Sequence, residues 1–344
     1  MSDPSSTPST TPIRTAIAGL GRAGWKIHAL TIQKRTDFQL VAVIDQDAGR
    51  RAEAESTFPG CRAFADWKVF LKEKNGAEFV VIATPSIAHG PMSIEALKAG
   101  LHVMSEKPMA MNVKEAERMI AAAKKAKRIL TIHQNHRSDA ELHHLLAIIN
   151  SGILGKVFMI KMCGNRFSRR NDWQTLRKYG GGTLNNTCPH NIDQVLQLLQ
   201  SPVKDVWGDL QACITAGNAD DHVKVLIRGK SGRVIDLEVS DACALPQPAW
   251  VMMGTLGTLV QEGKEFVIKY LDPSKLSKLK VMDTVAVPDR KYGVIGGETL
   301  EWNEKRVPAC PASRPHRRCG RCARSPGRAG PSRARRCRRC ARRW

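Results

Sequence analysis

The stretch FVVIATPSIAHGPMSIEALKAGLHVMSEKPMA, residues 79–110, decides the fold. Its first five residues are apolar, largely β-branched and not alternating, which is typical of a parallel strand buried on both faces. A short helix is expected over about residues 90–99, because Gly100 supplies the left-handed residue that often ends a helix. A second buried strand over residues 101–104 leads into Glu106-Lys107-Pro108. Polar residues thus follow two successive strands at their carboxyl ends, the edge where open α/β sheets bind ligands.

A glycine-rich motif precedes this stretch. The sequence GLGRAG, residues 19–24, follows an expected strand over 13–18 and opens an expected helix that runs to about residue 34. In this setting the first glycine makes a tight turn, the second lets the backbone approach a pyrophosphate, and the third lets helix pack on strand. The predicted dinucleotide loop therefore comprises Gly19, Gly21, Arg22, Ala23 and Gly24.

The expected second strand, residues 40–44, ends in Asp45, 21 residues after Gly24. A carboxylate there accepts hydrogen bonds from the adenosine ribose and repels the 2′-phosphate of NADP. The predicted cofactor is therefore NAD or NADP, with NAD favoured. Arg50 and Arg51 keep NADP open, because either guanidinium could pair with a 2′-phosphate.

Strands and helices alternate over residues 13–133, which predicts a Rossmann-type, doubly wound parallel sheet in an α/β domain. Helices are expected over about 66–74 and 113–127, and a further strand over 129–132. Beyond residue 133 a helix over 139–150 precedes longer strands with few helices between them. These strands are expected over 157–163, 206–215, 223–228, 233–239, 250–254 and 266–270. This pattern predicts a second, α+β domain with a large open, mainly antiparallel sheet over residues 134–305.

The chain ends differ from the body. Residues 1–12 are rich in Ser, Thr and Pro, lack the features of a secretion signal, and predict a disordered leader. The net charge of +22 includes 14 Arg from residues 306–344, so residues 1–305 carry only +8. The five body cysteines are scattered singly, as in cytoplasmic proteins, and no apolar run has the length of a membrane span. We therefore expect a cytoplasmic protein without membrane contact.

Two interpretations of residues 306–344 remain open. Cys319-x-x-Cys322 and Cys337-x-x-Cys340 approach zinc-ribbon spacing, and the arginines would then bind nucleic acid. However, residues 308–344 contain no Val, Ile, Leu, Phe, Tyr or Met with which to pack a zinc module. Arg, Ala, Pro, Gly and Cys are what GC-rich DNA encodes out of frame. We favour a frameshifted, disordered tail, and no nucleic-acid partner unless the tail is genuine.

Taken together, the motifs resemble the Gfo/Idh/MocA oxidoreductases (glucose–fructose oxidoreductase and inositol 2-dehydrogenase) from about residue 13 to 302. The family pattern T-P-x-x-x-H … A-G-x-H-V-x-x-E-K-P-x-A is matched over residues 84–110. The resemblance implies a Rossmann domain followed by an open-sheet domain that binds substrate and mediates homo-oligomerisation. It also extends the expected cofactor site to Thr84, Pro85, His89, Glu106 and Lys107.

The resemblance implies that Lys107 lies beside the nicotinamide and that His190 is the acid/base residue. The family motif G-G-G-x-x-x-D-x-G-x-H-x-x-D is altered here, since Asn186 replaces its first aspartate and Cys188 its fourth glycine. Asp193 keeps the last acidic position. The change marks either a subfamily with its own substrate, which we favour, or a weakened catalyst.

The expected catalytic residues are therefore Lys107, His190 and Asn186. Asn135 and Arg137, just beyond the last strand of the first domain, are expected to bind substrate with Asn186, His190 and Asp193. The loop residues Arg169, Arg170 and Trp173 either close over the substrate or are solvated. The remaining histidines lack a Cys or carboxylate set with metal spacing, so no metal is expected.

The predicted function is hydride transfer between a nicotinamide cofactor and a secondary hydroxyl of a sugar, cyclitol or related polyol. His190 has an unperturbed pKa suited to a base, and Lys107 would stabilise the developing alkoxide. A non-catalytic dinucleotide-binding sensor is one alternative, favoured by Asn186. Nucleic-acid binding through the tail is the other.

Overall fold

The computed structural model describes residues 11–281, 283, 293 and 299–309. The predicted leader, apart from its last two residues, lies outside this part of the chain, and so do residues 310–344 of the predicted tail. The described chain forms two compact units, and residues 169–190 and 211–221 cluster with the first of them. The division made from the sequence instead places those residues in the range 134–305.

The first unit contains a six-stranded sheet in the order β3-β2-β1-β4-β5-β6. All five strand pairings are parallel, as predicted. The strands are β1 (Ile13–Ala18), β2 (Phe38–Ile44), β3 (Arg62–Phe64), β4 (Phe79–Ile82), β5 (His102–Ser105) and β6 (Leu130–Ile132). Because β1 lies between β2 and β4, the chain reverses its direction of winding there, which creates the expected ligand-binding edge.

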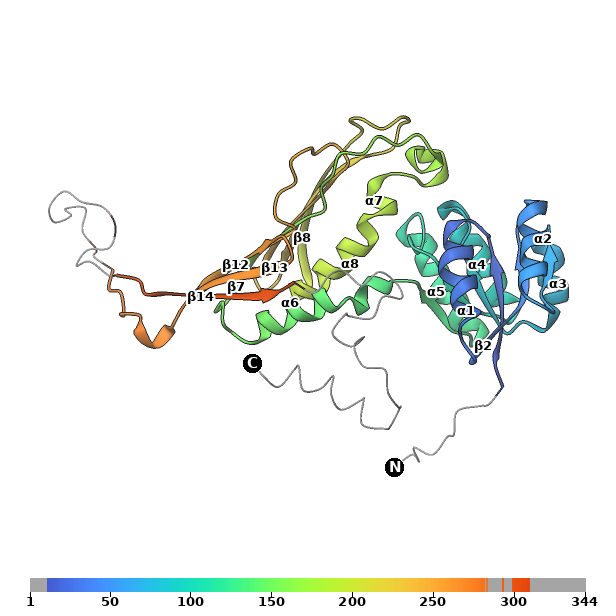
Figure 1. The fold of residues 1–344 in the computed structure, drawn as a ribbon, viewed down its shortest axis with the longest axis horizontal. Coiled ribbons are helices and arrows are strands. Elements are labelled where there is room, and N and C mark those ends of the chain that lie inside the picture. Colours follow the sequence, from blue (N-terminus) through green and yellow to red (C-terminus); the bar gives the residue numbers. More distant parts are fainter. Residues whose placement is uncertain (1–10, 282, 284–292, 294–298, 310–344) are drawn as a thin grey trace, which may run out of the picture. The chain divides into compact units, whose positions relative to one another are not determined.

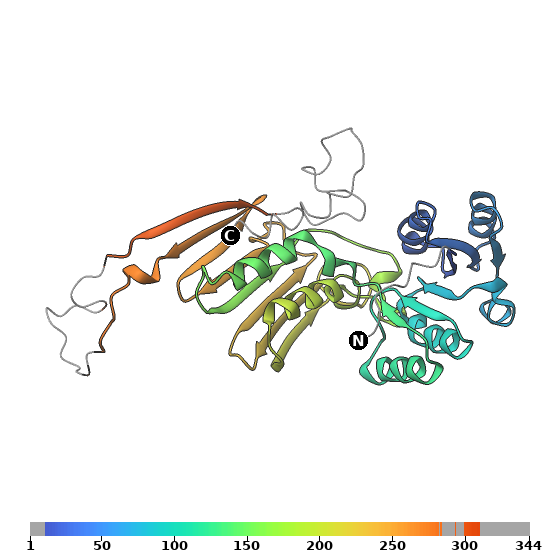
Figure 2. The same cartoon turned by 90° about the horizontal axis from the view of Figure 1, so that it is seen from below.

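Helices cover both faces of this sheet (Figures 1 and 2). A π-helical segment (Ala23–Ala29) continues into α1 (Leu30–Ile32), and the other helices are α2 (Ala48–Thr57), α3 (Trp67–Glu73), α4 (His89–Lys98) and α5 (Val113–Ala126). Alternate residues of one strand enter different cores. Ala16 and Ala18 pack in the cluster that includes Leu97 of α4, whereas Ile17 packs in the cluster that includes Ala54 of α2. This two-sided burial explains the unalternating apolar strands.

Local signals position most of these elements. Gly100 has a φ of +87° after α4, as predicted for the residue that ends a helix. Asn112 caps α5 by accepting a hydrogen bond from the amide of Glu115 at 2.9 Å. Helix α2 and strand β3 were not predicted. The signal for α2 was Asp47, whose carboxylate accepts from the Arg50 amide at 2.9 Å.

The second unit is built on an eight-stranded sheet in the order β14-β13-β12-β11-β7-β10-β9-β8. The β7–β10 pair is parallel, and the other pairs with an assigned register are antiparallel, so the predicted mainly antiparallel sheet is confirmed. The strands are β7 (Val157–Cys163), β8 (Val203–Gln211), β9 (His222–Gly229), β10 (Val234–Ser240), β11 (Trp250–Gly254), β12 (Gly257–Glu262), β13 (Glu265–Leu271) and β14 (Trp302–Pro308). Strand β14 includes the first three residues assigned to the tail.

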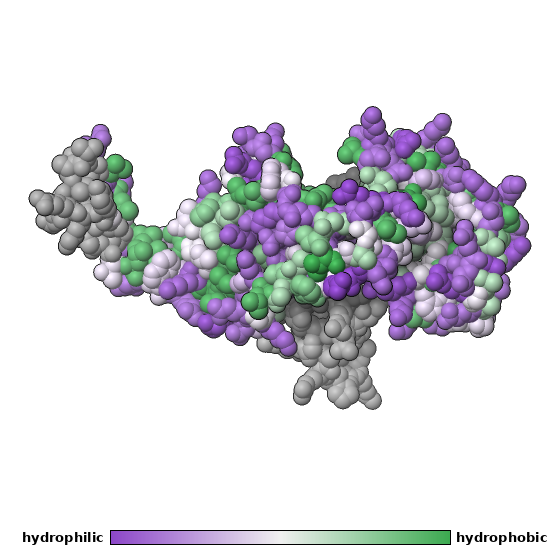
Figure 3. Space-filling model, turned by 90° about the horizontal axis from the view of Figure 1, so that it is seen from above, coloured by the Kyte–Doolittle hydropathy of each residue, from purple (hydrophilic) through white to green (hydrophobic). Residues whose placement is uncertain are grey.

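Helices α6 (Ala140–Asn150) and α8 (Cys188–Leu199) lie along one face of this sheet (Figure 2). The Trp250 indole donates to Glu141 of α6 at 2.6 Å, and Arg233 donates to the carbonyl of Leu198 in α8 at the edge of the same face. Figure 3, seen from the opposite direction, shows apolar and polar residues intermixed on the surface of this unit. Among the described helices, none is both long and apolar enough to cross a membrane.

The strand predicted over residues 206–215 is shifted, because β8 ends at Gln211. The amides of Cys213, Ile214 and Thr215 instead donate to the carboxylate of Asp221 at 2.7–2.8 Å. These three hydrogen bonds lower the pKa of Asp221 to about 2, although burial of the carboxylate opposes them as the largest single effect. A side chain thus satisfies amides that the sequence pattern assigned to a strand.

Candidate active site

The glycine-rich turn has the geometry of a phosphate-binding loop. Gly19 has a φ of +89°, and a Cβ added there would lie 2.7 Å from the carbonyl oxygen of Ala83. A Cβ on Gly24 would lie 1.8 Å from the carbonyl oxygen of Gly19. Contacts with the protein backbone therefore exclude a side chain at both positions. A Cβ on Gly21 would meet nothing within 4 Å. The loop therefore leaves an open backbone surface at its second glycine, which fits a bound pyrophosphate. Arg22 beside it is exposed, and Ala23 starts the following π-helical segment.

Asp45 is held rigidly at the carboxyl end of β2. Its Oδ2 accepts from the Leu20 amide at 2.7 Å, and its Oδ1 accepts from the Asp47 amide at 2.9 Å. Arg51 donates to the backbone carbonyl of Asp45 at 2.8 Å, whereas Arg50 is half-exposed with its Nη1 3.7 Å from Asp45 Oδ2. A carboxylate fixed beside the glycine loop retains lone pairs for ribose hydroxyls. This arrangement fits NAD.

The segment after β4 is tied to the segment after β5 by one imidazole. His89 is 2% exposed, its Nε2 lies 2.9 Å from the Thr84 carbonyl, and its Nδ1 lies 2.8 Å from the Pro108 carbonyl. The Thr84 hydroxyl lies 3.6 Å from the sulfur of Met92. His89 therefore links the loop that contains Thr84 and Pro85 to the loop that contains Pro108, so these residues support the turns at the carboxyl ends of β4 and β5.

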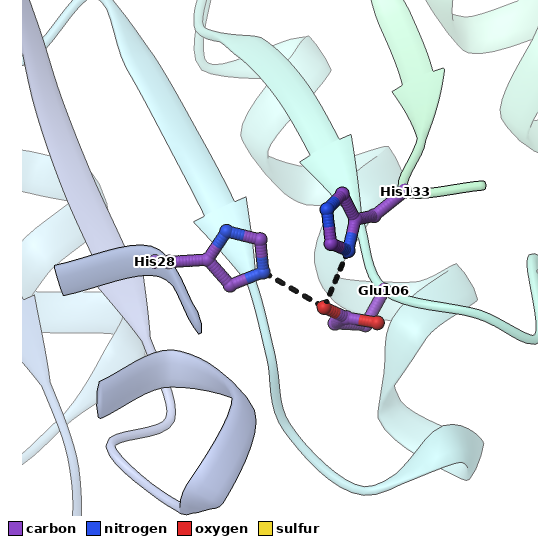
Figure 4. Close-up of side chains that lie close together, drawn as sticks. All are labelled: His28, Glu106 and His133. Atoms are coloured by element: carbon purple, nitrogen blue, oxygen red, sulfur yellow. Dashed lines mark hydrogen bonds and ion pairs between the residues drawn. The ribbon is translucent and has the colours of Figure 1, made fainter. Parts of the chain in front are cut away.

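Glu106 is the centre of a buried cluster with His28 and His133 (Figure 4). His28 Nε2 lies 2.8 Å from Glu106 Oε1, and His133 Nδ1 lies 2.9 Å from the same oxygen. Burial raises the pKa of Glu106, but the hydrogen bonds and charges of the two rings outweigh burial and hold the pKa well below its usual range. Glu106 thus carries a buried, fully partnered negative charge.

These three side chains are the one His/Cys/Asp/Glu group, among described residues, whose ligand atoms lie within 4.8 Å of one another. Ligand atoms around a tetrahedral Zn²⁺ lie about 3.3 Å apart, whereas both nitrogens here are at hydrogen-bond distance from one oxygen. The geometry is that of a hydrogen-bonded cluster. The sequence spacing of residues 28, 106 and 133 did not predict this cluster, because the three residues come together only in the folded sheet.

Lys107 follows this cluster and reaches a different segment. Its Nζ donates to the backbone carbonyl of Asn186 and lies 3.5 Å from Asn186 Oδ1. Burial is the main cause that lowers the pKa of Lys107; Glu106 raises it, and the charges of Arg22 and Arg170 lower it further. The predicted pair of Lys107 and Asn186 is therefore in direct contact.

Asn186, at the end of α7 (Thr183–Asn186), belongs to a polar network that sequence reasoning missed. Gln174 Nε2 donates to Asn186 Oδ1 at 3.0 Å, and Asn186 Nδ2 donates to Gln174 Oε1 at 3.2 Å. Arg170 donates to the same Gln174 oxygen and to Asp172 Oδ2, the latter at 2.6 Å. Arg170 is thus built into the site, whereas Arg169 and Trp173 are exposed.

His190 lies in the first turn of α8. Its Nδ1 is 3.1 Å from Gln134 Oε1, and Gln134 Nε2 donates to the Pro189 carbonyl at 3.2 Å. A proton on Nδ1 satisfies the Gln134 oxygen and leaves the acceptor lone pair of a neutral ring on Nε2. Gln134, just beyond β6, was not singled out from the sequence.

The remaining predicted substrate residues divide between the two units. Asn135 is half-buried at the start of a 3₁₀ turn in the first unit. Arg137 and Asp193 belong to the second unit, where Arg137 Nε lies 2.9 Å from both oxygens of Asp193. The structure thus forms two separate pairs, Lys107 with Asn186 and Arg137 with Asp193.

Comparison with known proteins identifies the family. Residues 13–134 match the family model described as "Oxidoreductase family, NAD-binding Rossmann fold", and residues 142–260 match the "GFO/IDH/MocA C-terminal domain". The chain belongs to the Gfo/Idh/MocA oxidoreductase family. The resemblance found in the motifs is thereby confirmed, as is the NAD-binding Rossmann domain.

Curated relatives of this Gfo/Idh/MocA chain include dehydrogenases of sugars and cyclitols. The uncharacterized oxidoreductase YdgJ of Escherichia coli is 28% identical over 86% of this chain and 82% of its own length. The myo-inositol 2-dehydrogenase of Thermotoga maritima is 28% identical over 64% of this chain and 66% of its own. The D-glucoside 3-dehydrogenase of E. coli is 28% identical, and the match covers 57% of each chain.

Solved structures agree with the fold. An NAD-binding protein from Listeria innocua has a TM-score of 0.70 at 25% identity, covering 78% of this chain and 79% of its own. The WlbA dehydrogenase from Chromobacterium violaceum, solved in complex with NADH and UDP-GlcNAcA, has a TM-score of 0.66 at 26% identity. That match covers 73% of this chain and 76% of WlbA.

Proposed function

We propose that this family member is an NAD(P)-dependent dehydrogenase that acts on a secondary hydroxyl of a sugar, cyclitol or related polyol. The observation that carries the proposal is the ammonium of Lys107, partly buried beside the cofactor edge and held on Asn186. An ammonium fixed there is preorganised to stabilise the negative charge of an alkoxide as the hydroxyl proton leaves. The named activities of the curated relatives support the substrate class.

We assign the proton transfer to His190. Gln134 holds the ring by Nδ1, so Nε2 is the atom that takes the hydroxyl proton. Asn186 and Gln174 orient the substrate through amide groups, and neither can accept a proton. The nicotinamide cofactor, held by the glycine loop and Asp45, supplies the hydride-accepting chemistry when bound.

We further propose that one face of the second unit's sheet, on which the helices α6 and α8 do not lie (Figure 2), pairs with a second copy of the chain. Val251, Val260 and Val267 form one cross-strand row on the face opposite to the buried row of Met252, Leu259 and Ile268. Contiguous apolar surface can mark a protein–protein interaction site, and this row supplies apolar side chains at the centre of such a surface. Light scattering should give the mass of an oligomer, and Val260→Glu should shift it toward the monomer.

The experiment for the catalytic proposal is a panel of polyols, sugars and uronic acids assayed with NAD and with NADP, following the absorbance of the reduced cofactor. The proposal expects turnover of at least one secondary alcohol. Tight NADH binding with no turnover across the panel would favour the non-catalytic sensor, the alternative raised by Asn186.

A further inference from the structure

The ammonium group of Lys107 has neutral hydrogen-bond partners and cationic neighbours. Within the described chain, its hydrogen bonds go to the carbonyl oxygen and Oδ1 of Asn186. The guanidinium groups of Arg22 and Arg170 are close enough to act on it electrostatically, and both disfavour its charge. A partly buried cation in such surroundings gains stability from an anionic hydrogen-bond partner.

Two carboxylates linked to this network already have other partners. Glu106 attracts Lys107 electrostatically, but its Oε1 accepts from both imidazoles and its Oε2 accepts from the Lys107 backbone amide at 3.3 Å. Asp172 is exposed and forms an ion pair with Arg170 at 2.6 Å. Neither the Glu106 carboxylate nor the Asp172 carboxylate accepts a hydrogen bond from the Lys107 ammonium.

Position 186 decides the charge of the site. The side chain there lies beside the Lys107 ammonium, and it is an amide held in a reciprocal pair with the amide of Gln174. A carboxylate at this position would neutralise Lys107, whereas the amide leaves the positive charge in place. The Gln174 oxygen is in turn fixed by Arg170, so the amide pair is locked and cannot turn away.

We propose that the substrate itself supplies the missing negative charge, as a carboxylate on the sugar that also carries the reacting hydroxyl. The site thus selects sugar acids, such as hexuronates, over neutral sugars. A single ammonium that has no carboxylate as a hydrogen-bond partner among the described residues matches one carboxylate charge, and Arg170 and the amide of Gln174 offer planar donors beside it. This inference rests on the proposed function and names the substrate class of the same site.

Matched ligands test the inference by binding alone. D-Glucuronate and D-glucuronamide, and likewise D-galacturonate and D-galacturonamide, differ by one charge and almost nothing in shape. Their affinities for the NADH-loaded full-length chain are measured by calorimetry. The wild-type chain should bind at least one uronate about 10-fold or more tightly than its amide, because a charged hydrogen bond is replaced by a neutral one.

Asn186→Asp places a carboxylate beside Lys107 and should abolish the preference for the uronate. Asn185→Asp adds the same charge one position away, on a side chain that donates to the Gly181 carbonyl at 3.3 Å, and should leave the preference intact. NADH affinity reports whether each variant is folded. If Asn186→Asp does not fold, Arg170→Gln serves instead and should weaken uronate binding more than amide binding.

Equal affinity for acid and amide in the wild-type chain would overturn the inference. If neutral polyols were nevertheless oxidised, the proposed dehydrogenase activity would be supported and only the preference for sugar acids would be rejected. If the chain bound NADH but no ligand of either series and turned over no polyol, both the inference and the proposed function would fall.

Discussion

Lys107 donates a hydrogen bond from Nζ to the backbone carbonyl oxygen of Asn186, 79 positions further along the chain. This contact joins the end of β5 to the segment that leads into α8. It places the ammonium beside the turn at Asn186, four residues before His190 in the sequence. The proposed chemistry depends on this connection, because His190 removes the hydroxyl proton and Lys107 stabilises the alkoxide that forms.

The pH profile of turnover should reflect the charge on Lys107. Burial, Arg22 and Arg170 lower the pKa of Lys107, so the protonated form is lost at a lower pH than for an ordinary lysine. We expect kcat/KM to fall as the pH rises through that pKa. Arg170→Gln removes one neighbouring cation, raises the pKa of Lys107 and should move the alkaline limb to higher pH. Arg169→Gln, on an exposed neighbour, is the matched control. A limb that does not move in Arg170→Gln would show that Lys107 is not the titrating group.

Acid stability should depend on Glu106. The folded-state pKa of this carboxylate is depressed, so its stabilisation is present above the ordinary glutamate pKa and is lost as the pH falls through the folded value. Glu106→Gln should lower the free energy of unfolding by about 1–3 kcal/mol near pH 7, because the buried imidazole donors then share a neutral amide oxygen in place of a charged carboxylate. The difference from wild type should shrink as the pH is lowered in urea unfolding experiments.

Glu95→Gln is the control for that experiment. Glu95 forms a partly exposed ion pair with Lys68, and such pairs contribute about 0–1 kcal/mol. If Glu106→Gln were no more damaging than Glu95→Gln, the buried cluster would be less important than its geometry indicates.

Cofactor choice should depend on Asp45. Replacing it by serine removes a charged acceptor for the ribose hydroxyls and should weaken NAD binding by about 10-fold or more, with NADP affected less. Fluorescence titration with NADH and NADPH measures both affinities. Asp47→Asn, which retains a helix-capping side chain for α2, should leave both unchanged. Unchanged NADH affinity in Asp45→Ser would place the ribose elsewhere.

Gln134 should affect the rate of turnover by fixing the tautomer of His190. Gln134→Leu removes the acceptor for the Nδ1 proton, so the ring loses the tautomer that leaves Nε2 as the base. We expect kcat to fall by about 10-fold or more, within the range of general-base effects. Gln134→Glu keeps an oxygen acceptor and should retain most of the activity. Equal losses in both variants, or none in either, would argue against His190 as the base.

The parallel sheet and the glycine loop were predictable because their causes are local. Two-sided burial gives unalternating strands such as 79–82, and steric limits at Gly19 and Gly24 give a recognisable spacing. The course of residues 211–221 was not predictable, since the Asp221 carboxylate competes with a strand ladder for backbone amides.

The candidate site divides in the same way. Lys107 and His190 are identified by motifs, whereas their supporting residues come from long-range contacts. Glu106 contacts His28, which is 78 positions away in the sequence, and Gln134 contacts His190, which is 56 positions away. No sequence period connects such residues, because the tertiary fold brings them together.

The most direct measurement is the rate of hydride transfer by the Lys107→Met variant, under conditions in which NAD binding is saturated and shown to be normal. Methionine keeps an unbranched side chain that is one heavy atom shorter and removes the charge. The account predicts a loss of about 10²–10³ in kcat, as for removal of one donor that stabilises an oxyanion, and little change in Lys68→Met, whose lysine pairs with Glu95. Full turnover by Lys107→Met would contradict it.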